Sequence, residues 1–497
     1  MNPPAVDRML LGVRREEWPL AILLAASFFL VISSFWILKP LKKALFLLHY
    51  DAEGLAIGPL LWNAAQAELL VKVLNLVVAA VAFAALSALA TRFRRERLML
   101  VVSGFFFVGY VGFAVVLRAP EPASLAVWSF YLFGDLLASV MVAAFFSFVN
   151  DSLRPEAAKR LLGPIGLGGV LGGLVGSSVL RLLLDRLSTA DWLVVTAGLA
   201  VGIALLAIAA GRRVAAIDAR AEHPAADATA TNAEAEREVV HAEERGRPVE
   251  IERGGSPALA GARLVLASPY LLAIATTVGV YEIVSTVVDF QFTTTVHTTL
   301  DGPALGRHLA RVYLLTNVAS VAVQAFLTSL VMRRFGVGAA LAVLPVALGL
   351  ASVGFLFVPT LAFASLLSLA DNSLAYSIAQ SSKEMLYVPT TTAERYQAKA
   401  FIDVFVQRLA KVLAIGVSLA LTTWTGADQV RWLGLLSIPL VGVSLLAVSR
   451  AGCDFRVREH EIEGPCPNPL AEVRRWIGRR VLRPATRRVG GLRTGDA

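Results

Sequence analysis

Charged side chains stand inside stretches of the chain that are otherwise apolar for the length of a helix. A charge at the centre of a bilayer costs on the order of 3 kcal/mol, so such residues usually face a partner, a water-filled cavity or a solute path. The chemistry they suit is electrostatic recognition of a charged solute. They are Glu68, Lys72, Asp135, Arg181, Glu282, Asp289, Asp371, Arg408 and Lys411, with Lys39, Lys42, Lys43, Lys383 and Glu384 at predicted span ends.

The spacing of these charges separates structural roles from functional ones. Glu68 and Lys72 are four residues apart, which predicts an ion pair on one helix face. Asp135, Asp289 and Asp371 have no opposite charge three or four residues away. For Asp135 and Asp289 we therefore favour function over structural pairing. Asp371 is open, since the next residue, an asparagine, and nearby serines can satisfy it locally.

The elements that position these residues follow from composition. Of the 497 residues 56% are hydrophobic and 17% are charged, whereas soluble proteins carry about 25% charged residues. The apolar runs are Leu, Ala and Val in helix-length blocks, which excludes an alternating-strand barrel. Soluble enzymes, DNA-binding proteins and secreted disulfide scaffolds are excluded as well. We predict an all-α integral membrane protein that is not an enzyme and has no metal or cofactor.

Helix-length apolar blocks recur along the chain, and each needs roughly 20 residues to span a bilayer. We predict twelve spans, at residues 19–38, 66–90, 98–118, 125–149, 161–184, 191–211, 267–289, 310–332, 336–359, 361–383, 404–424 and 431–449. The predicted domains are an N-terminal six-helix half, a cytoplasmic linker, a C-terminal six-helix half and a basic cytoplasmic tail, at residues 1–211, 212–263, 264–450 and 451–497.

Arginines collect between spans on one side of the predicted bundle, together with both termini. They follow the second, fourth and eighth spans, as at Arg97, Arg160 and Arg333. By the positive-inside rule this side is the cytoplasm, so we predict a multi-pass protein of the cell inner membrane with both termini cytoplasmic. In the tail, apolar residues around Trp476 alternate with arginines, which predicts an amphipathic segment on anionic lipid.

Glycines and cysteines have plain structural interpretations. The four-residue spacing of Gly168, Gly172 and Gly176 predicts close helix packing. The run fits no phosphate-binding loop, so an ATP-hydrolysing pump is excluded. Cys453 and Cys466 are expected to be free cytosolic thiols, because too few ligands surround them for a zinc site.

Two halves of six helices joined by a long loop are the outline of a major-facilitator-like transporter, in which two pseudo-repeats enclose the substrate. A short internal sequence similarity supports the repeat: the segment 154–160 after the fourth span is similar to the segment 393–400 after the tenth. In this architecture spans one, four, seven and ten line the central cavity. Asp135, Asp289 and Asp371 fall on three of them.

Three segments resemble the bacterial and plastidic ATP/ADP translocases. The first, WILKPLKKAL at 36–45, is similar to the family's ILRTxKDxL. The second runs from Asp135 through EAAKR at 156–160 to GLG at 166–168. The third and most specific comprises KEMLYVP at 383–389, KAFIDV at 399–404 and RLAK at 408–411, similar to KEMAYIP, GKAAIDV and RxGK. A weaker match places VDF at 288–290 on the family's VEV.

The resemblance implies counter-exchange of ATP against ADP, with phosphate as a further solute, by alternating access of the two halves. Lysines and arginines would hold the phosphates, and Asp135 and Asp289 would act as gate or switching partners. No nucleic-acid partner is expected, and the oligomeric state stays open. The implied substrate-binding residues are Lys39, Lys42, Asp135, Asp289, Lys383, Glu384, Arg408 and Lys411.

The chain departs from the family pattern at four charged positions. Lys43 replaces an acid, Lys39 an arginine, Asp289 a longer acid and Thr293 a lysine. Such changes can retune the ligand's charge or size. Two alternatives therefore stay open: a transporter of another phosphorylated or anionic solute, and a non-transporting membrane interaction or assembly protein. The second must explain why charges persist inside helices at about 2 to 3 kcal/mol each if they have no partner.

Overall fold

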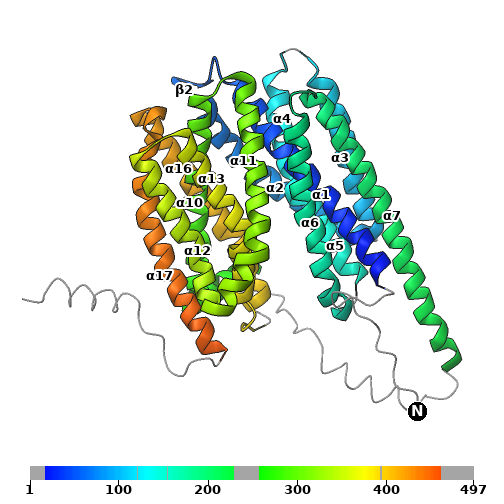
Figure 1. Ribbon diagram of the computed structural model, residues 1–497. Helices are drawn as coiled ribbons and strands as arrows, with labels where there is room; N and C mark the ends of the chain where they lie inside the picture. Colours follow the sequence, from blue (N-terminus) through cyan, green and yellow to red (C-terminus); the bar gives the residue numbers. More distant parts are fainter. Residues whose placement is uncertain are drawn as a thin grey trace, which may run out of the picture.

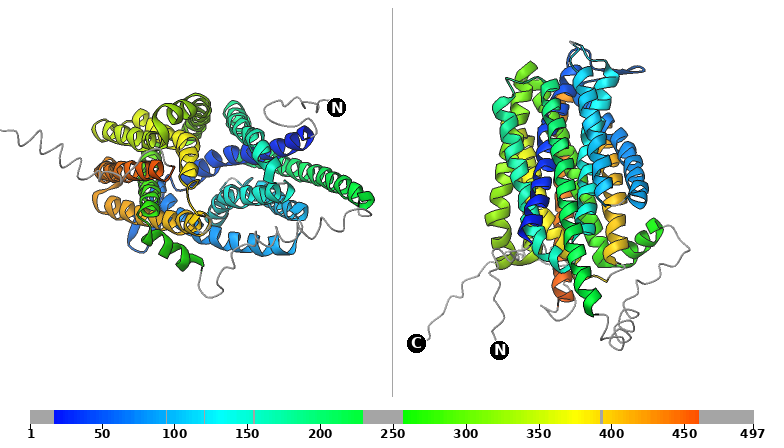
Figure 2. Two further views of the ribbon diagram at one scale, coloured as in Figure 1. Left: turned by 90° about the horizontal axis from the view of Figure 1, so that it is seen from below. Right: turned by 90° about the vertical axis from the view of Figure 1, so that its right-hand side faces the viewer.

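A computed structural model describes residues 17–93, 95–119, 121–153, 155–228, 257–391 and 394–459. These residues form two helical lobes that stand side by side (Figures 1 and 2). We call the lobe of residues 17–228 the N-lobe and that of residues 257–459 the C-lobe. Apart from one short hairpin, all their regular structure is helical, as the sequence predicted.

The N-lobe extends from α1 to α7, which is its longest helix. Its elements are α1 (Trp18–His49), the hairpin β1 (Leu55–Ile57) and β2 (Leu60–Trp62), α2 (Ala64–Arg92), α3 (Arg95–Val116), α4 (Ser124–Leu136), the π-helical η1 (Leu137–Met141), α5 (Val142–Ser152), α6 (Pro155–Leu183) and α7 (Thr189–Ala228). Because α4, η1 and α5 are continuous, they act as one membrane-length helix over residues 124–152.

The C-lobe has helices of similar length with more π-helical interruptions. Its elements are α9 (Pro257–Ala267), α10 (Pro269–Thr299), α11 (Gly302–Ala322), η3 (Val323–Thr328), α12 (Ser329–Phe357), α13 (Leu361–Leu374), η4 (Ala375–Ala379), α14 (Gln380–Leu386), η5 (Glu394–Ala398), α15 (Lys399–Phe401), η6 (Ile402–Val406), α16 (Gln407–Thr425), η7 (Ala427–Leu433) and α17 (Gly434–Arg458). Single π-helical turns inside α-helices are frequent at functional sites.

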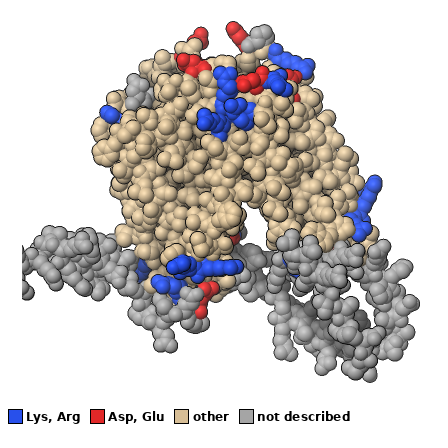
Figure 3. Space-filling view, in the orientation of Figure 1, with Lys and Arg blue, Asp and Glu red and all other residues tan. Residues whose placement is uncertain are grey.

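The surface shows where the bilayer lies. Figure 3 shows Lys, Arg, Asp and Glu side chains at the upper and lower ends, with a broad band between them that carries almost none. In the described residues eleven helical stretches are long and apolar enough to cross a membrane. The predicted eighth and ninth spans fall in one stretch of 56 residues, Gly302–Phe357, which leaves helical geometry at Gly336, where φ is 79°.

The first helix is longer than predicted. The sequence places the end of the first span at residue 38, but α1 continues to His49 with Pro40 inside it. Neighbouring helices can satisfy the carbonyl that a proline leaves unpaired in a membrane helix. The prediction that Lys39, Lys42 and Lys43 stand at a span end is therefore wrong. The helix continues past them because partners on other helices offset the cost of burying their charges.

The predicted linker and tail lie largely outside the described residues. Within the predicted linker α7 continues to Ala228 and α9 begins at Pro257, and within the predicted tail α17 continues to Arg458. The amphipathic tail segment around residue 476 lies outside the described residues. Cys453 is disulfide-bonded, so the prediction of a free thiol is wrong for this residue. The number of cysteines in a sequence does not tell whether two of them lie close enough to bond.

The glycine run of α6 packs closely against another helix, as predicted, and the structure shows that this helix is α1. A Cβ atom on Gly168, Gly172 or Gly176 would lie 2.2 to 2.7 Å from the backbone oxygens of Ala25, Phe29 and Ser33. These contacts repeat on three successive turns of both helices, and the Ser33 hydroxyl donates to the Gly172 carbonyl at 3.0 Å. Only glycine permits this approach, which fixes α1 and the lysines that it carries.

We expect Gly172→Ala to destabilise the protein by about 1 to 3 kcal/mol, because the added methyl group meets the rigid backbone of α1. Gly166→Ala, on the same helix with open space around the position, is the matched control. Thermal unfolding of the purified variants in detergent measures the difference. Equal melting temperatures for the two variants would contradict the packing role.

Candidate functional site

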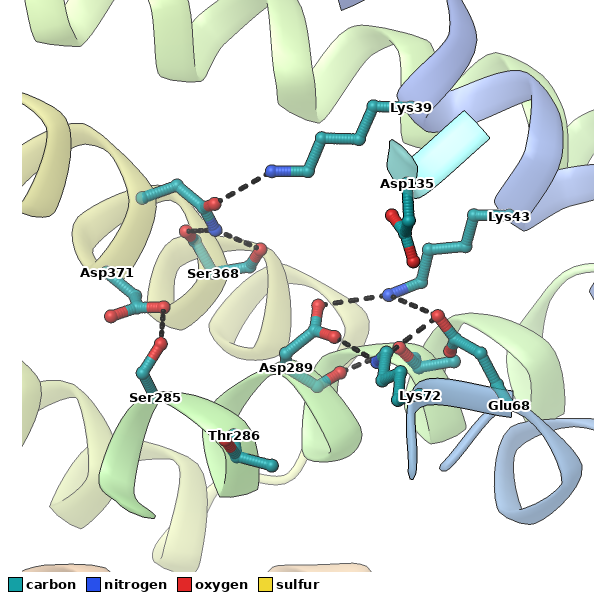
Figure 4. A network of polar contacts seen from close by, with 12 residues as sticks. Lys39, Lys43, Glu68, Lys72, Asp135, Ser285, Thr286, Asp289, Ser368 and Asp371 are labelled. Carbon is teal, nitrogen blue, oxygen red and sulfur yellow. Dashed lines mark hydrogen bonds and ion pairs between the residues drawn. The ribbon is translucent and has the colours of Figure 1, made fainter. Parts of the chain in front are cut away.

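Four charged residues join the two lobes. Lys43 on α1 and Lys72 on α2 share Asp289 of α10, at 3.0 and 2.5 Å between nitrogen and oxygen. Glu68 on α2 lies 3.5 Å from Lys43 and 3.2 Å from Lys72. Figure 4 shows the side chains converging from three helices. We call this neutral set of two lysines and two carboxylates the inter-lobe cluster.

The inter-lobe cluster is shielded from solvent on its N-lobe side. The side chains of Lys43 and Glu68 are 4% and 1% exposed, and the Tyr131 hydroxyl donates to Glu68 at 2.7 Å. Removing one member of a buried ion pair costs about 3 to 5 kcal/mol, because the other charge is left without a partner. The inter-lobe cluster therefore links the lobes through groups that cannot separate without new partners.

The cluster lies toward the upper end of the seam between the lobes. Lys43 is close to the upper end of α1, and Glu68 is one turn from the upper start of α2. Figure 3 shows the surface hollowed between the lobes at the lower end. The seam is thus tied by charges on one side and open on the other.

Lys42 belongs to a separate pair within the N-lobe. Its ammonium group is buried, forms an ion pair with Asp135 of α4, and lies 4.4 Å from the ring centroid of Tyr131. Both members were predicted as site residues, and the structure brings them together. Tyr131 also contacts Glu68, so it connects this pair to the inter-lobe cluster.

Lys39 is the lysine of α1 that has no acidic partner among the described residues. Its ammonium group donates to the Asn372 side-chain oxygen at 3.1 Å, across the seam. Four aromatic rings surround it at 4.9 to 5.7 Å, and they are Phe35, Trp36, Tyr313 and Tyr376. Cation–π contacts offset part of its desolvation, but no carboxylate in the described part of the chain lies within ion-pair distance of it.

A cavity of about 390 Å³ opens in the C-lobe beside Lys39. Lys411 lines it and pairs with Glu282 at 3.3 Å. Lys383 lines it from α14 and pairs with Asp403 at 3.4 Å. Its remaining polar lining includes Tyr281, Ser285, Asp371, Asn372, Tyr376, Gln380, Gln407 and Ser444. Volumes of this order accommodate small organic ligands.

The predicted site residues fall into three places. Lys383 and Lys411 line the cavity and Lys39 adjoins it, while Lys42, Asp135 and Asp289 form ion pairs deeper in the bundle. The other two lie apart. Glu384 pairs with Lys399 at 2.6 Å in an exposed position, and Arg408 donates to the Leu76 carbonyl at 3.0 Å, across the seam.

Sequence reasoning missed several partners. The predicted pair of Glu68 and Lys72 is present at 3.2 Å, but it is half of a larger cluster. Lys43 was not among the predicted substrate-binding residues, yet it bridges Glu68 and Asp289. An apolar span that contains a charge signals that a partner exists, but it does not tell which helix supplies that partner.

Solved structures of membrane transporters share this architecture. A point mutant of the nucleoside transporter NupG matches with a TM-score of 0.57 at 14% identity, over 88% of this chain and 99% of that one. The E. coli xylose transporter XylE, in an inward-open conformation, matches at 0.55 and 12%, over 92% and 99%. The POT-family transporter PepTSo matches at 0.56 and 11%, over 89% and 98%. The fold is therefore major-facilitator-like.

The fold and the charged site between two lobes define a membrane transporter. Residues 122–453, about two thirds of the sequence, match the family described as TLC ATP/ADP transporter. The chain belongs to the TLC ATP/ADP transporter family. No curated protein sequence matches significantly. The matched range contains the second and third segments that resemble the translocases, whereas the α1 lysines precede it.

We expect Asp289→Asn to favour closure of the lower opening, because two N-lobe lysines lose their C-lobe acid. A cysteine introduced at the cavity-lining Gln380 should then react several-fold more slowly with an impermeant maleimide that is applied from the side of the membrane that the lower opening faces. The control is Asp185→Asn, which removes an exposed inter-lobe pair with Arg307 and should change little. An unchanged rate in a folded Asp289→Asn protein would contradict the gate.

Proposed function

We propose that this protein exchanges ATP for ADP across the membrane by alternating access of its two lobes. Family membership is the observation that carries the proposal. The arrangement is physically suited to it, since a nucleotide's phosphates leave water only where fixed cations replace their hydration. Lys39, Lys383 and Lys411 surround one cavity beside the seam.

We propose twelve crossings in two six-helix halves, with both termini in the cytoplasm of the cell inner membrane. The start of α1 and the end of α17 lie at the same lower end (Figure 1), which requires an even number of crossings. The stretch 302–357 is about 84 Å long as a helix, enough for two crossings of a core of about 30 Å. The domain boundaries proposed from the sequence are kept.

The lysines and acids have distinct roles in this proposal. Lys39 meets the phosphates first because no acid competes for it, and Lys383 and Lys411 exchange Asp403 and Glu282 for phosphate oxygens. Charge-assisted bonds to phosphate are as strong as those given up. Asp135 and Asp289 hold Lys42 and Lys43 until the lobes move. The basic tail rests on anionic lipid, as its sequence suggests.

A non-transporting membrane protein is the second candidate. Asp135, Asp289, Lys383 and Lys411 each have an opposite charge nearby. The cost of holding these charges in helices is therefore offset inside the protein, and it no longer argues against this candidate. What favours transport is the family and the polar cavity.

In proteoliposomes, uptake of labelled ADP should require nucleotide inside the vesicle. Lys383→Ala should abolish this uptake while the protein stays folded, because a cavity cation is lost. Lys42→Ala should do the same, since Asp135 loses its partner.

The matched control is Lys399→Ala, whose exposed pair lies outside the cavity lining. Uptake into vesicles without internal nucleotide would contradict exchange. Normal uptake by Lys383→Ala would show that Lys383 is not part of the substrate site.

A panel of ligands added to the detergent-purified protein tests the substrate. A ligand that binds the folded state raises its melting temperature by mass action. We expect ATP and ADP to stabilise the protein and AMP to fail, with NAD, phosphate and sugar phosphates as comparisons. Stabilisation only by a non-nucleotide anion would replace the substrate, and no response to any ligand would favour the non-transporting candidate.

A further inference from the structure

Asp371 is a buried carboxyl group that the proposed exchange mechanism does not use. It lies on α13, lines the cavity and is 4% exposed. One oxygen, Oδ2, accepts a hydrogen bond from the Ser285 hydroxyl at 2.7 Å. The other, Oδ1, has no hydrogen-bond partner among the described residues. Figure 4 shows the side chain of Asp371 and its bond to Ser285, apart from the inter-lobe cluster.

The charges around Asp371 are already engaged. On α10 the acids Glu282 and Asp289 hold Lys411 of α16 and the N-lobe lysines, respectively. From α14 Lys383 holds Asp403. The cavity side of α12 is formed by apolar residues. Other ionisable groups near it are Tyr281 of α10, Tyr313 of α11, Tyr376 of η4 and Lys39 of α1, and His308 of α11 forms a hydrogen bond with Ser365 of α13 at 2.8 Å.

Asp371 therefore has no cation within 4 Å in the described part of the chain, whereas Glu282, the other acid of the cavity lining, pairs with Lys411. Lys39 comes nearest in connectivity, since it bonds to the adjacent residue, Asn372, and not to the carboxyl group. A buried carboxylate without a cation is costly, and taking up a proton removes that cost. Protonation also turns one oxygen of this cavity-lining carboxyl group from an acceptor into a donor.

We propose that Asp371 is a proton-binding site coupled to the substrate: the carboxyl group takes up one proton as the anion enters the cavity. The inference rests on the proposed function. A carboxylate in the cavity repels the phosphates, whereas the neutral acid can donate a hydrogen bond to them. The proton comes from cavity water, forms an O–H bond on Oδ1 and leaves when the anion leaves, so no redox partner is needed.

Linkage gives this proposal a measurable signature. If binding adds one proton, the dissociation constant for ADP rises by up to about tenfold per pH unit. The useful range lies above about pH 7, where the nucleotide's own phosphates are ionised. Asp371→Asn, which keeps the shape and removes the titration, should bind ADP with a constant that does not follow pH. The direction is set: nucleotide affinity falls as pH rises.

The experiment is calorimetric titration of ADP into the purified full-length protein, in buffers that differ in ionisation enthalpy. Wild type should take up close to one proton per ADP at a pH where its affinity is falling. Asp371→Asn should take up none beyond the contribution of ADP. Ser285→Ala should retain the uptake, because it removes a hydrogen bond and leaves the carboxyl group. Glu121→Gln, an exposed carboxyl outside the cavity, is the matched control.

Equal proton uptake by wild type and Asp371→Asn would overturn the proposal, as would zero uptake by wild type. Replacement of protons by Na⁺ as the ion that enhances ADP binding would overturn it too, since it would make Asp371 a metal-cation ligand. If Asp371→Asn does not fold, Asp371→Glu, which should keep the uptake, takes its place beside wild type, and a loss of uptake there contradicts the assignment.

Failure of the proposed function gives a different result. If ADP produces no heat in any buffer, the nucleotide assignment fails. The carboxyl group is then followed by infrared difference spectroscopy during a pH change without ligand. A protonated-carboxyl band that is present in wild type and missing from Asp371→Asn supports the proton site, and its absence from wild type overturns it.

Discussion

A charge that cannot reach water must meet an opposite charge, and this bundle meets that requirement across the seam between its lobes. The inter-lobe cluster joins α1 and α2 of the N-lobe to Asp289 of the C-lobe. Because Lys43 and Glu68 are almost wholly buried, the cluster holds the upper seam while the lower end is hollowed. The position of α1 against the glycines of α6 keeps the lysines in register with their partners.

The same requirement explains how a closed set of ion pairs can serve transport. Each cavity lysine already has a carboxylate partner, so a phosphate replaces one anion with another and no lysine is left bare. Lys39 and Asp371 are the exceptions at the cavity, one positive and one negative, held by Asn372 and Ser285 respectively. These two residues are where an incoming anion changes the charge balance most.

Much of the fold could be predicted from the sequence, because span length, apolar composition and glycine spacing are local properties. Close packing at the glycines of α6 and the pair of Glu68 with Lys72 follow from spacing along one helix, but the spacing does not identify α1 as the helix that packs on the glycines. The end of α1 was misplaced because hydropathy counts a lysine as a stop, while Lys42 and Lys43 are neutralised by residues on other helices. Cross-helix partners, such as Asp403 for Lys383, need three-dimensional proximity that no spacing rule contains.

In the proposed exchange, nucleotide drives the lobes between two arrangements of this seam. Spin labels on Arg213→Cys in the second half of α7 and on Arg334→Cys beside the bend at Gly336, in a background without the native cysteines, report the distance between the lobes by pulsed electron paramagnetic resonance. Both positions are exposed. We expect a long distance in the free protein and a second, shorter population with ADP. A single distance unchanged by ATP and ADP would contradict it.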